Sequence, residues 1–122
     1  MSEPRPPILL VEDDRDTRTM MTMALEMAGH QVVAAANGVE AFTLARAHRP
    51  ALILLDLMMP AMSGEQFRAA QLASEHLRAI PVVVVSAHPH AHRIARQMKA
   101  SACIGKPVDF KVLAEVLEQH CS

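Results

Sequence analysis

The chain has 122 residues, a length that fits one domain of ordinary size. Hydrophobic residues make up 51% of it and charged residues 20%, a composition typical of a folded globular protein rather than a disordered chain. The net charge is -1 and the chain has no long basic run, so neither nucleic acid nor a membrane surface is indicated as a partner.

The first seven residues and the two cysteines bear on the cellular compartment that we expect for the protein. Residues 1–7 are polar with three prolines and contain no apolar signal core, so we interpret them as a short N-terminal tail. Cys103 and Cys121 are too few for a disulfide framework, and no apolar run approaches the length of a membrane span. We therefore expect a cytoplasmic protein that is not inserted in a membrane.

Short apolar runs alternate with amphipathic stretches along the rest of the chain. The apolar runs do not alternate with polar residues, so both faces of each predicted strand should be covered, as in a parallel sheet. In chain order these predicted strands are Ile8–Val11, Val32–Ala36, Leu52–Leu55, Val82–Val85 and the weaker Ala102–Ile104.

The segments between the predicted strands have the residue spacing of helices. Met21, Leu25 and Ala28 recur on one face of the first segment, and Gly29 follows where a helix commonly ends. The predicted helices are Thr17–Ala28, Val39–His48, Glu65–Ser74, Ala91–Ala100 and Phe110–Gln119. Alternating strands and helices predict an α/β fold with a doubly wound five-stranded parallel sheet.

Polar residues directly follow the predicted strands, at the sheet edge where such folds bind ligands. They are Glu12, Asp13 and Asp14 after the first strand, Asp56 after the third, Ser86 after the fourth and Lys106 after the fifth. Each residue taken alone is better explained as a helix cap, a turn residue or a surface charge. Their joint occurrence at successive strand ends favours a common site.

The chemistry of this set points to phosphoryl transfer. Grouped carboxylates repel one another unless a cation lies among them, and ligands that are all oxygen atoms suit Mg²⁺. A carboxylate beside Mg²⁺ can act as a nucleophile toward phosphorus. A hydroxyl and an ammonium group can then bind the remaining phosphoryl oxygens.

Several motifs occur in order along the chain. Residues 8–14 read ILLVEDD, residues 36–41 read ANGVEA, and residues 56–64 read DLMMPAMSG, which fits the pattern D-x-x-M-P-x-M-x-G. Residues 81–87 read PVVVVSA, and a Lys-Pro pair stands at 106–107. Together, from Ile8 to about Gln119, they resemble the receiver domain of bacterial response regulators. The resemblance implies a flavodoxin-like (βα)5 receiver fold over residues 8–122, similar to stand-alone chemotaxis regulators.

The resemblance also implies a phosphorylation site. Asp56 would accept a phosphoryl group from a sensor histidine kinase or a histidine phosphotransfer protein. Asp13 and Asp14 would hold Mg²⁺, together with Asp56 and the main-chain carbonyl of Met58. The Lys106–Pro107 peptide bond is cis in similar domains.

Signal output is implied in the same way. Lys106 would contact the phosphoryl group, and Ser86 would turn toward it. A downstream protein would bind the face made by the fourth helix, the fifth strand and the fifth helix, where Ile94 and Met98 are candidate contacts. Cys103 departs from the family pattern because it stands where similar domains often carry Tyr or Phe, so the aromatic part of the usual switch is missing.

Two other functions stay open. Phosphohydrolases with an aspartate nucleophile also use a parallel sheet and Mg²⁺, but they resemble a D-x-D pattern, and Met58 stands where the second Asp would be. A receiver-like scaffold that works without phosphate is favoured by Cys103 and opposed by Asp56, Ser86 and Lys106. We therefore expect a signalling switch in a two-component phosphorelay rather than an enzyme.

The histidines at 88, 90 and 92 lack the spacing of a zinc motif. We expect them in a solvated loop before the fourth helix. His88, two residues after Ser86, is placed to affect the lifetime of a phosphoryl group.

Overall fold

Within residues 5–59 and 61–120, the part of the chain that the computed structural model describes, five parallel strands form one sheet in the order β2-β1-β3-β4-β5. The elements are β1 (Ile8–Val11), α1 (Arg15–Met27), β2 (Val32–Ala35), α2 (Gly38–His48), β3 (Leu52–Leu55), α3 (Gly64–Leu72), β4 (Val82–Ser86), α4 (Ala91–Gln97), β5 (Ala102–Gly105) and α5 (Phe110–His120). The start of the predicted tail, Pro60 of the loop motif and Cys121 lie outside the described residues.

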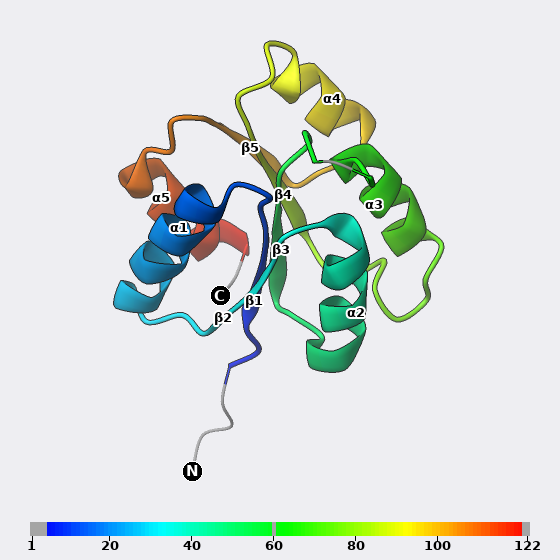
Figure 1. Cartoon of the computed structure of the whole chain (residues 1–122), viewed down its shortest axis with the longest axis horizontal. Coiled ribbons are helices and arrows are strands. Elements are labelled where there is room, and N and C mark those ends of the chain that lie inside the picture. The colour runs from blue at the N-terminus through cyan, green and yellow to red at the C-terminus, as the bar shows by residue number, and fades with distance from the viewer. Residues whose placement is uncertain (1–4, 60, 121–122) are drawn as a thin grey trace.

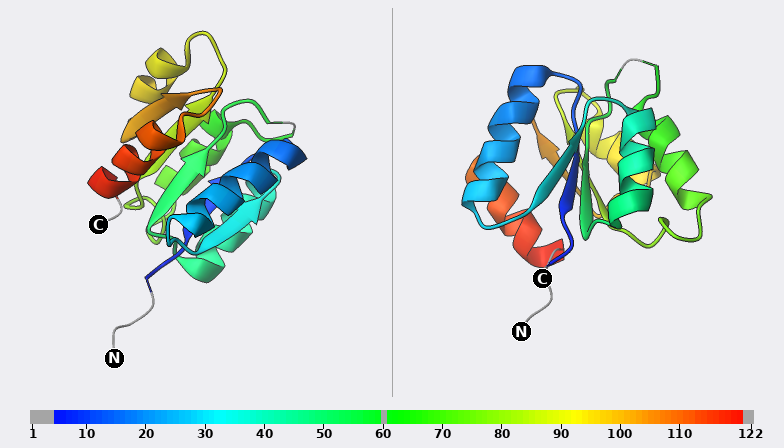
Figure 2. Two further views of the ribbon diagram at one scale, coloured as in Figure 1. Left: turned by 90° about the vertical axis from the view of Figure 1, so that its left-hand side faces the viewer. Right: turned by 60° about the horizontal axis from the view of Figure 1, so that its bottom comes forward.

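Helices cover both faces of the sheet. Helices α1 and α5 lie on one face, and α2, α3 and α4 lie on the other (Figure 1). The views in Figure 2 show the sheet between these two helical layers. The chain first builds outward from β1 to β2, then returns to β3 on the other side of β1, so the order of strands reverses between β1 and β3. This is the doubly wound α/β fold that the sequence predicts.

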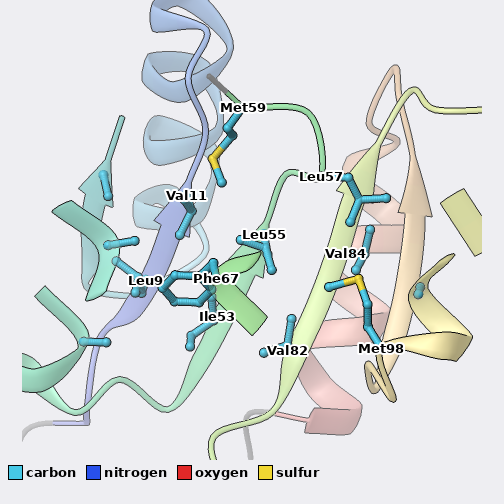
Figure 3. Close-up of a cluster of buried hydrophobic side chains, with 14 of the residues drawn as sticks. Leu9, Val11, Ile53, Leu55, Leu57, Met59, Phe67, Val82, Val84 and Met98 are labelled. Carbon is cyan, nitrogen blue, oxygen red and sulfur yellow. The ribbon is translucent and has the colours of Figure 1, made fainter. Parts of the chain in front are cut away.

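The strands are apolar throughout because alternate residues enter different cores. Leu9 and Val11 pack in the core beneath α2, α3 and α4, which also contains Phe67 (Figure 3). Ile8 and Leu10 point the other way and pack with side chains of α1 and α5. Burial on both faces explains why the strand sequences show no polar alternation.

Most elements begin and end within two residues of their predicted bounds, but α4 does not. It ends at Gln97, three residues before the predicted end at Ala100. Lys99 has a left-handed backbone with φ of 58°, and the Ala100 amide donates to the Ala95 carbonyl at 2.9 Å. The left-handed residue stops the helix, as it does at many helix ends.

The expectation that Met98 is part of a partner-binding surface is wrong, whereas the same expectation for Ile94 stays a prediction. Met98 is buried in the core on the side of α2, α3 and α4 (Figure 3), and Ile94 is half-buried against the same core. Helix α4 is short and lies close to the sheet, so the apolar residues of its last turn serve packing.

No helix among the described residues combines the length and the apolar character needed to cross a bilayer.

Candidate functional site

The carboxyl ends of two neighbouring strands, β1 and β3, bring an acidic cluster together. Val11 of β1 pairs with Leu55 of β3, so Glu12 and Asp56 leave adjacent strands at the same level. Oxygen atoms of Glu12, Asp13 and Asp56 lie within 4.8 Å of one another. Glu12 and Asp56 are buried, whereas Asp13 is exposed. Among the described residues, this is the one group of acidic, His or Cys side chains close enough to hold a metal ion.

Lys106 joins this cluster from the end of β5. Its ammonium nitrogen lies 2.5 Å from Glu12 Oε1 and 3.5 Å from Asp56 Oδ2. Burial acts to lower the pKa of Lys106, but the hydrogen bond to Glu12 and the charges of both carboxylates outweigh it and raise that pKa. Lys106 is therefore a firmly charged ammonium shared by two carboxylates. The Lys106–Pro107 bond that follows is cis, as the resemblance implies.

Asp14 does not join the cluster, contrary to its predicted role beside Asp13. It is the N-cap of α1, and its Oδ2 accepts hydrogen bonds from the amide of Thr17 at 2.8 Å and from the hydroxyl of Thr17 at 2.6 Å. These hydrogen bonds lower the pKa of Asp14. Glu12, which the sequence prediction placed after the strand but gave no ligand role, is the second acidic residue of the cluster.

The N-cap position of Asp14 could have been predicted from the sequence. Three acidic residues in a row do not show by themselves which two face the sheet edge. Asp14, however, stands three residues before Thr17 at the start of an amphipathic segment, which is the N-cap position. The first two residues after the strand, Glu12 and Asp13, are then the ones left at the sheet edge.

The loop that carries Glu12 and Asp13 is held by hydrogen bonds. The Asp14 amide donates to Glu12 Oε2 at 3.1 Å, which fixes the carboxylate on the side away from Lys106. Arg18 of α1 reaches back, and its Nη1 donates to the main-chain carbonyls of Glu12 at 2.9 Å and Asp13 at 3.3 Å. Sequence patterns do not point to Arg18, because a lone arginine on a helix is usually a solvated charge.

Asp56 lies in a setting that opposes its negative charge. Burial, together with the nearby charge of Glu12, raises its pKa to about 7, despite the opposing effects of the Met58 amide and of Lys106. The Met58 amide donates to Asp56 Oδ1 at 3.2 Å. The Met58 side chain is exposed. A carboxyl with this pKa is poised to lose its proton when a cation approaches.

Gly64 closes the site from the side of α3. A Cβ atom built on Gly64 would lie 2.6 Å from the Asp56 carbonyl oxygen, so only glycine fits there. The Gly64 amide donates to the Leu57 carbonyl at 3.1 Å. The last position of the D-x-x-M-P-x-M-x-G motif therefore has a steric cause: it lets α3 begin directly against the main chain of Asp56.

Ser86 is the last residue of β4 and is buried. Its hydroxyl accepts a hydrogen bond from the His88 amide at 3.1 Å, and its carbonyl accepts one from the Lys106 amide at 3.1 Å. The backbone of Ser86 thus fixes the start of the loop that carries Lys106. The same hydroxyl is tied to the start of the segment that leads into α4.

The remaining polar features lie apart from this cluster. His88 Nδ1 accepts a hydrogen bond from the His90 amide at 3.0 Å, so these histidines hold their own loop. Cys103 is half-buried against the core, and burial raises the pKa of its thiol. A raised thiol pKa indicates a packing residue rather than a reactive one.

Comparisons with known proteins identify the family and relatives of the chain. The model of the response regulator receiver domain family matches residues 8–118. The polar-differentiation response regulator DivK of Brucella anthropi is 33% identical over 116 residues, which cover 93% of this chain and 94% of DivK. The relative from Brucella ovis is 32% identical over the same shares.

Solved structures extend the comparison to the fold. The chemotaxis protein CheY4 of Vibrio cholerae is similar with a TM-score of 0.87 and 26% identity, over 95% of this chain and 98% of that chain. A response regulator receiver protein of Pseudomonas putida is similar with a TM-score of 0.86 and 27% identity, over 97% and 99% of the two chains. The chain therefore belongs to the response regulator receiver domain family, as its sequence motifs indicate.

Proposed function

We propose that the protein is a single-domain response regulator of a two-component phosphorelay, in which Asp56 accepts a phosphoryl group from a phosphohistidine of a histidine kinase or phosphotransfer protein. The observation that carries the proposal is the position of Asp56, buried at the end of β3 between two acidic residues and the Lys106 ammonium. In the transfer, an Asp56 carboxylate oxygen attacks phosphorus, the phosphorus–nitrogen bond breaks, and the imidazole leaves with the bonding electrons.

The acidic cluster fits Mg²⁺ by its donor set. Glu12, Asp13 and Asp56 offer only oxygen atoms, and burial together with the charge of Glu12 raises the pKa of Asp56, so a cation at this site would favour its carboxylate form. We assign the metal to Glu12, Asp13 and Asp56, with the Met58 carbonyl as a further ligand from the family resemblance. A bound Mg²⁺ would neutralise the carboxylates and draw phosphoryl oxygens toward Asp56.

Lys106 and Ser86 complete the proposed mechanism. Lys106 is already 3.5 Å from an Asp56 oxygen and carries a secure positive charge, so it can bind a phosphoryl oxygen after the transfer. The Ser86 hydroxyl accepts a hydrogen bond from the His88 amide at 3.1 Å. If it turns toward the phosphoryl group, it gives up that hydrogen bond, and the segment before α4 changes with it. The phosphoryl group thereby shifts the population of conformers that a partner recognises.

The partners of this switch are proteins. A histidine kinase or phosphotransfer protein supplies the phosphoryl group, and a downstream protein binds the face built by α4, β5 and α5. Because Met98 is buried, α4 contributes to this face through its exposed residues, which are charged and polar ones such as His92 and Arg93. The phosphohydrolase alternative still has no second acid, since Met58 stands in that place with its side chain in solvent.

The test is incubation of the protein with a small phosphodonor and Mg²⁺, read by intact mass. One labile phosphoryl group should appear, and Asp56→Asn should abolish it. Asp16→Asn, which changes an exposed carboxylate in the first turn of α1, is the matched control and should keep the phosphoryl group. An unchanged mass of the native protein at saturating donor and Mg²⁺ would favour the phosphate-independent scaffold. Repeated turnover of the donor would favour the phosphohydrolase.

A further inference from the structure

Among the described residues, five polar or charged side chains are buried, and two of them lie outside the phosphoryl site. Glu12, Asp56 and Ser86 belong to the site, whereas Arg68 and Gln71 belong to α3. A buried polar side chain is costly unless it is hydrogen-bonded, and a buried charge more so. Arg68 and Gln71 therefore need an explanation that the proposed phosphoryl transfer does not supply.

Arg68 binds the main chain just beyond α4. Its Nε donates to the Met98 carbonyl and its Nη2 to the Lys99 carbonyl, both at 3.0 Å. Within the described part of the chain the ion pairs are those of Lys106, so the charge of Arg68 is met by carbonyl oxygens and not by a carboxylate. These carbonyls follow the last turn of α4, where the helix dipole favours a positive charge.

Gln71 ties the same arginine to a third segment. Its side-chain oxygen accepts a hydrogen bond from Arg68 Nη1 at 2.7 Å. Its side-chain nitrogen donates to the carbonyls of Leu77 and Ile80, both at 2.9 Å, in the segment that leads to β4. The polar groups of both side chains thus have hydrogen-bond partners. Removing one side chain would leave buried partners of the other without a hydrogen bond, which is destabilising.

The two ends of α4 are held very differently. At the C-terminal end, Arg68 fixes the Met98 and Lys99 carbonyls to α3. At the N-terminal end, the N-cap His90 makes no side-chain capping hydrogen bond. The segment before it is connected to the phosphoryl site, because the His88 amide donates to the Ser86 hydroxyl. One end of α4 is therefore clamped and the other is coupled to Ser86.

We propose that Arg68 and Gln71 form a clamp that anchors the C-terminal end of α4 to α3, so that structural change started at Asp56 and Ser86 is confined to residues 87–94. The confinement rests on the proposed phosphorylation, whereas the clamp itself does not. Without an aromatic residue at Cys103, the clamp limits the part of the α4, β5 and α5 face that responds to phosphorylation to the first turn of α4 and the loop before it. Breaking the clamp would let the change spread to the α4–β5 connection.

The clamp is tested first without any ligand, by amide hydrogen exchange measured residue by residue with NMR on the full chain. Arg68→Met keeps an unbranched apolar stem but removes the hydrogen-bond donors of the side chain. We expect the amides of Met98 and Ala100 to exchange about tenfold faster in this variant, with the amides of β1 and β3 unchanged. Arg96→Met, the same change at an exposed position of α4, should leave all of these rates within about twofold.

Unaltered exchange at Met98 and Ala100 in Arg68→Met would overturn the clamp. If this variant does not fold, Arg68→Lys serves instead, because it keeps the charge but loses the planar fork that binds two carbonyls at once. An exchange rate at Met98 and Ala100 equal to that of the native protein in Arg68→Lys would equally overturn the proposal.

The confinement is tested by adding Mg²⁺ and beryllofluoride, a mimic of the aspartyl phosphoryl group. In the native protein, amide chemical shifts should change at 56–58 and 86–94 and stay constant at 98–100. In Arg68→Met, the changes should extend to 98–105. Changes at 98–100 in the native protein would overturn the confinement. The absence of any change at 56–58 would count against the proposed phosphorylation instead, while the ligand-free exchange still decides the clamp.

Discussion

Asp13 and Asp14 are neighbours with the same side chain, yet they meet different surroundings. Asp13 lies in the acidic cluster, and Asp14 caps α1 through Thr17. The difference arises because the chain turns from strand to helix between them, so consecutive side chains leave the backbone in different directions. A pair of single variants can therefore separate stability from metal binding at adjacent positions.

We expect the Asp14 variant to lose stability and the Asp13 variant to lose phosphorylation. Asp14→Ala should lower the urea concentration at the midpoint of unfolding, the usual effect of removing an N-cap, and retain Mg²⁺-dependent phosphorylation. Asp13→Asn should retain the stability of the metal-free protein and lose Mg²⁺-dependent phosphorylation. Urea unfolding in EDTA and intact mass after phosphodonor treatment measure the two effects. Loss of phosphorylation in a fully stable Asp14→Ala would restore Asp14 to the metal site.

Asp56 predicts a pH dependence of stability in the absence of metal. Burial and Glu12 raise its folded-state pKa to about 7 from an ordinary value of 3.8. Between these values the folded chain holds a proton that the unfolded chain has released, so the free energy of unfolding falls as the pH rises through this window. The loss of stability caused by ionising Asp56 reaches its full size above the folded-state pKa.

The expected observation is a difference between the native protein and Asp56→Asn. In EDTA, the native protein should lose stability relative to the variant between about pH 4 and pH 7, and the variant should be the more stable of the two at pH 8. Thermal unfolding at a series of pH values measures this, and Mg²⁺ should reduce the gap at pH 8. Stability curves that run parallel across the whole range would contradict the raised pKa.

At the scale of the elements, the start of α3 is set by a close contact of main chains. A Cβ atom on Gly64 would meet the Asp56 carbonyl oxygen at 2.6 Å and Leu57 Cα at 2.9 Å. Backbone atoms cannot turn away as a flexible side chain can. Helix α3 and strand β3 would have to separate to accept any larger residue.

Gly64→Ala should therefore lower the free energy of unfolding by about 1–3 kcal/mol, the range for overpacking, and also slow the phosphorylation of Asp56 by displacing its main chain. Gly105→Ala is the matched control, since a Cβ atom there would meet nothing within 4 Å, and its stability should stay within about 0.5 kcal/mol of the native value. Equal effects of the two substitutions in urea unfolding would contradict the steric explanation.

The elements that local sequence determines could be predicted, and those that distant contacts determine could not. Strands buried on both faces have a strong apolar signal, so β1 and β3 match their predicted bounds. Helix α4 ends early because Lys99 adopts a left-handed backbone next to carbonyls that Arg68 binds from α3, 31 positions away. Nothing in the sequence of residues 91–100 reports that contact.

In the candidate site, too, some features could be predicted from the sequence and others could not. The strand ends correctly identified Asp56 and Lys106 as neighbours, because parallel strands bring their carboxyl ends together. Glu12, Asp13 and Asp14 are three consecutive acidic residues between β1 and α1. Predicting where the strand ends does not show which of them face the site and which one caps the helix. The support from Arg18 depended on a side chain that reaches back to the main chain of the strand end.

At the scale of the whole molecule, the sheet separates two cores that do not touch. Phe67 is buried on the side of α2, α3 and α4, where its ring meets Phe42 edge-on with centroids 6.4 Å apart. Leu117 is buried on the side of α1 and α5. Because different side chains line the two faces, damage on one side should not alter packing on the other.

We expect additive effects from substitutions in the two cores. Phe67→Leu and Leu117→Val should each lower the free energy of unfolding by about 1 kcal/mol, and the double variant should equal their sum within about 0.5 kcal/mol. Urea unfolding with a common transition slope measures this. A coupling above about 1 kcal/mol would show that the sheet transmits packing strain between its faces.

The contact between Lys106 and Glu12 joins positions 94 residues apart, with Asp56 between them in the sequence. No contiguous piece of the chain shorter than this span can hold the whole group. If the backbone were cut between β3 and β4, one fragment would keep the acceptor and the other the lysine, and neither could be labelled efficiently alone. Covalent labelling of Asp56 would then become an assay for reassembly of the two halves, a chemical signature that the tertiary structure has formed.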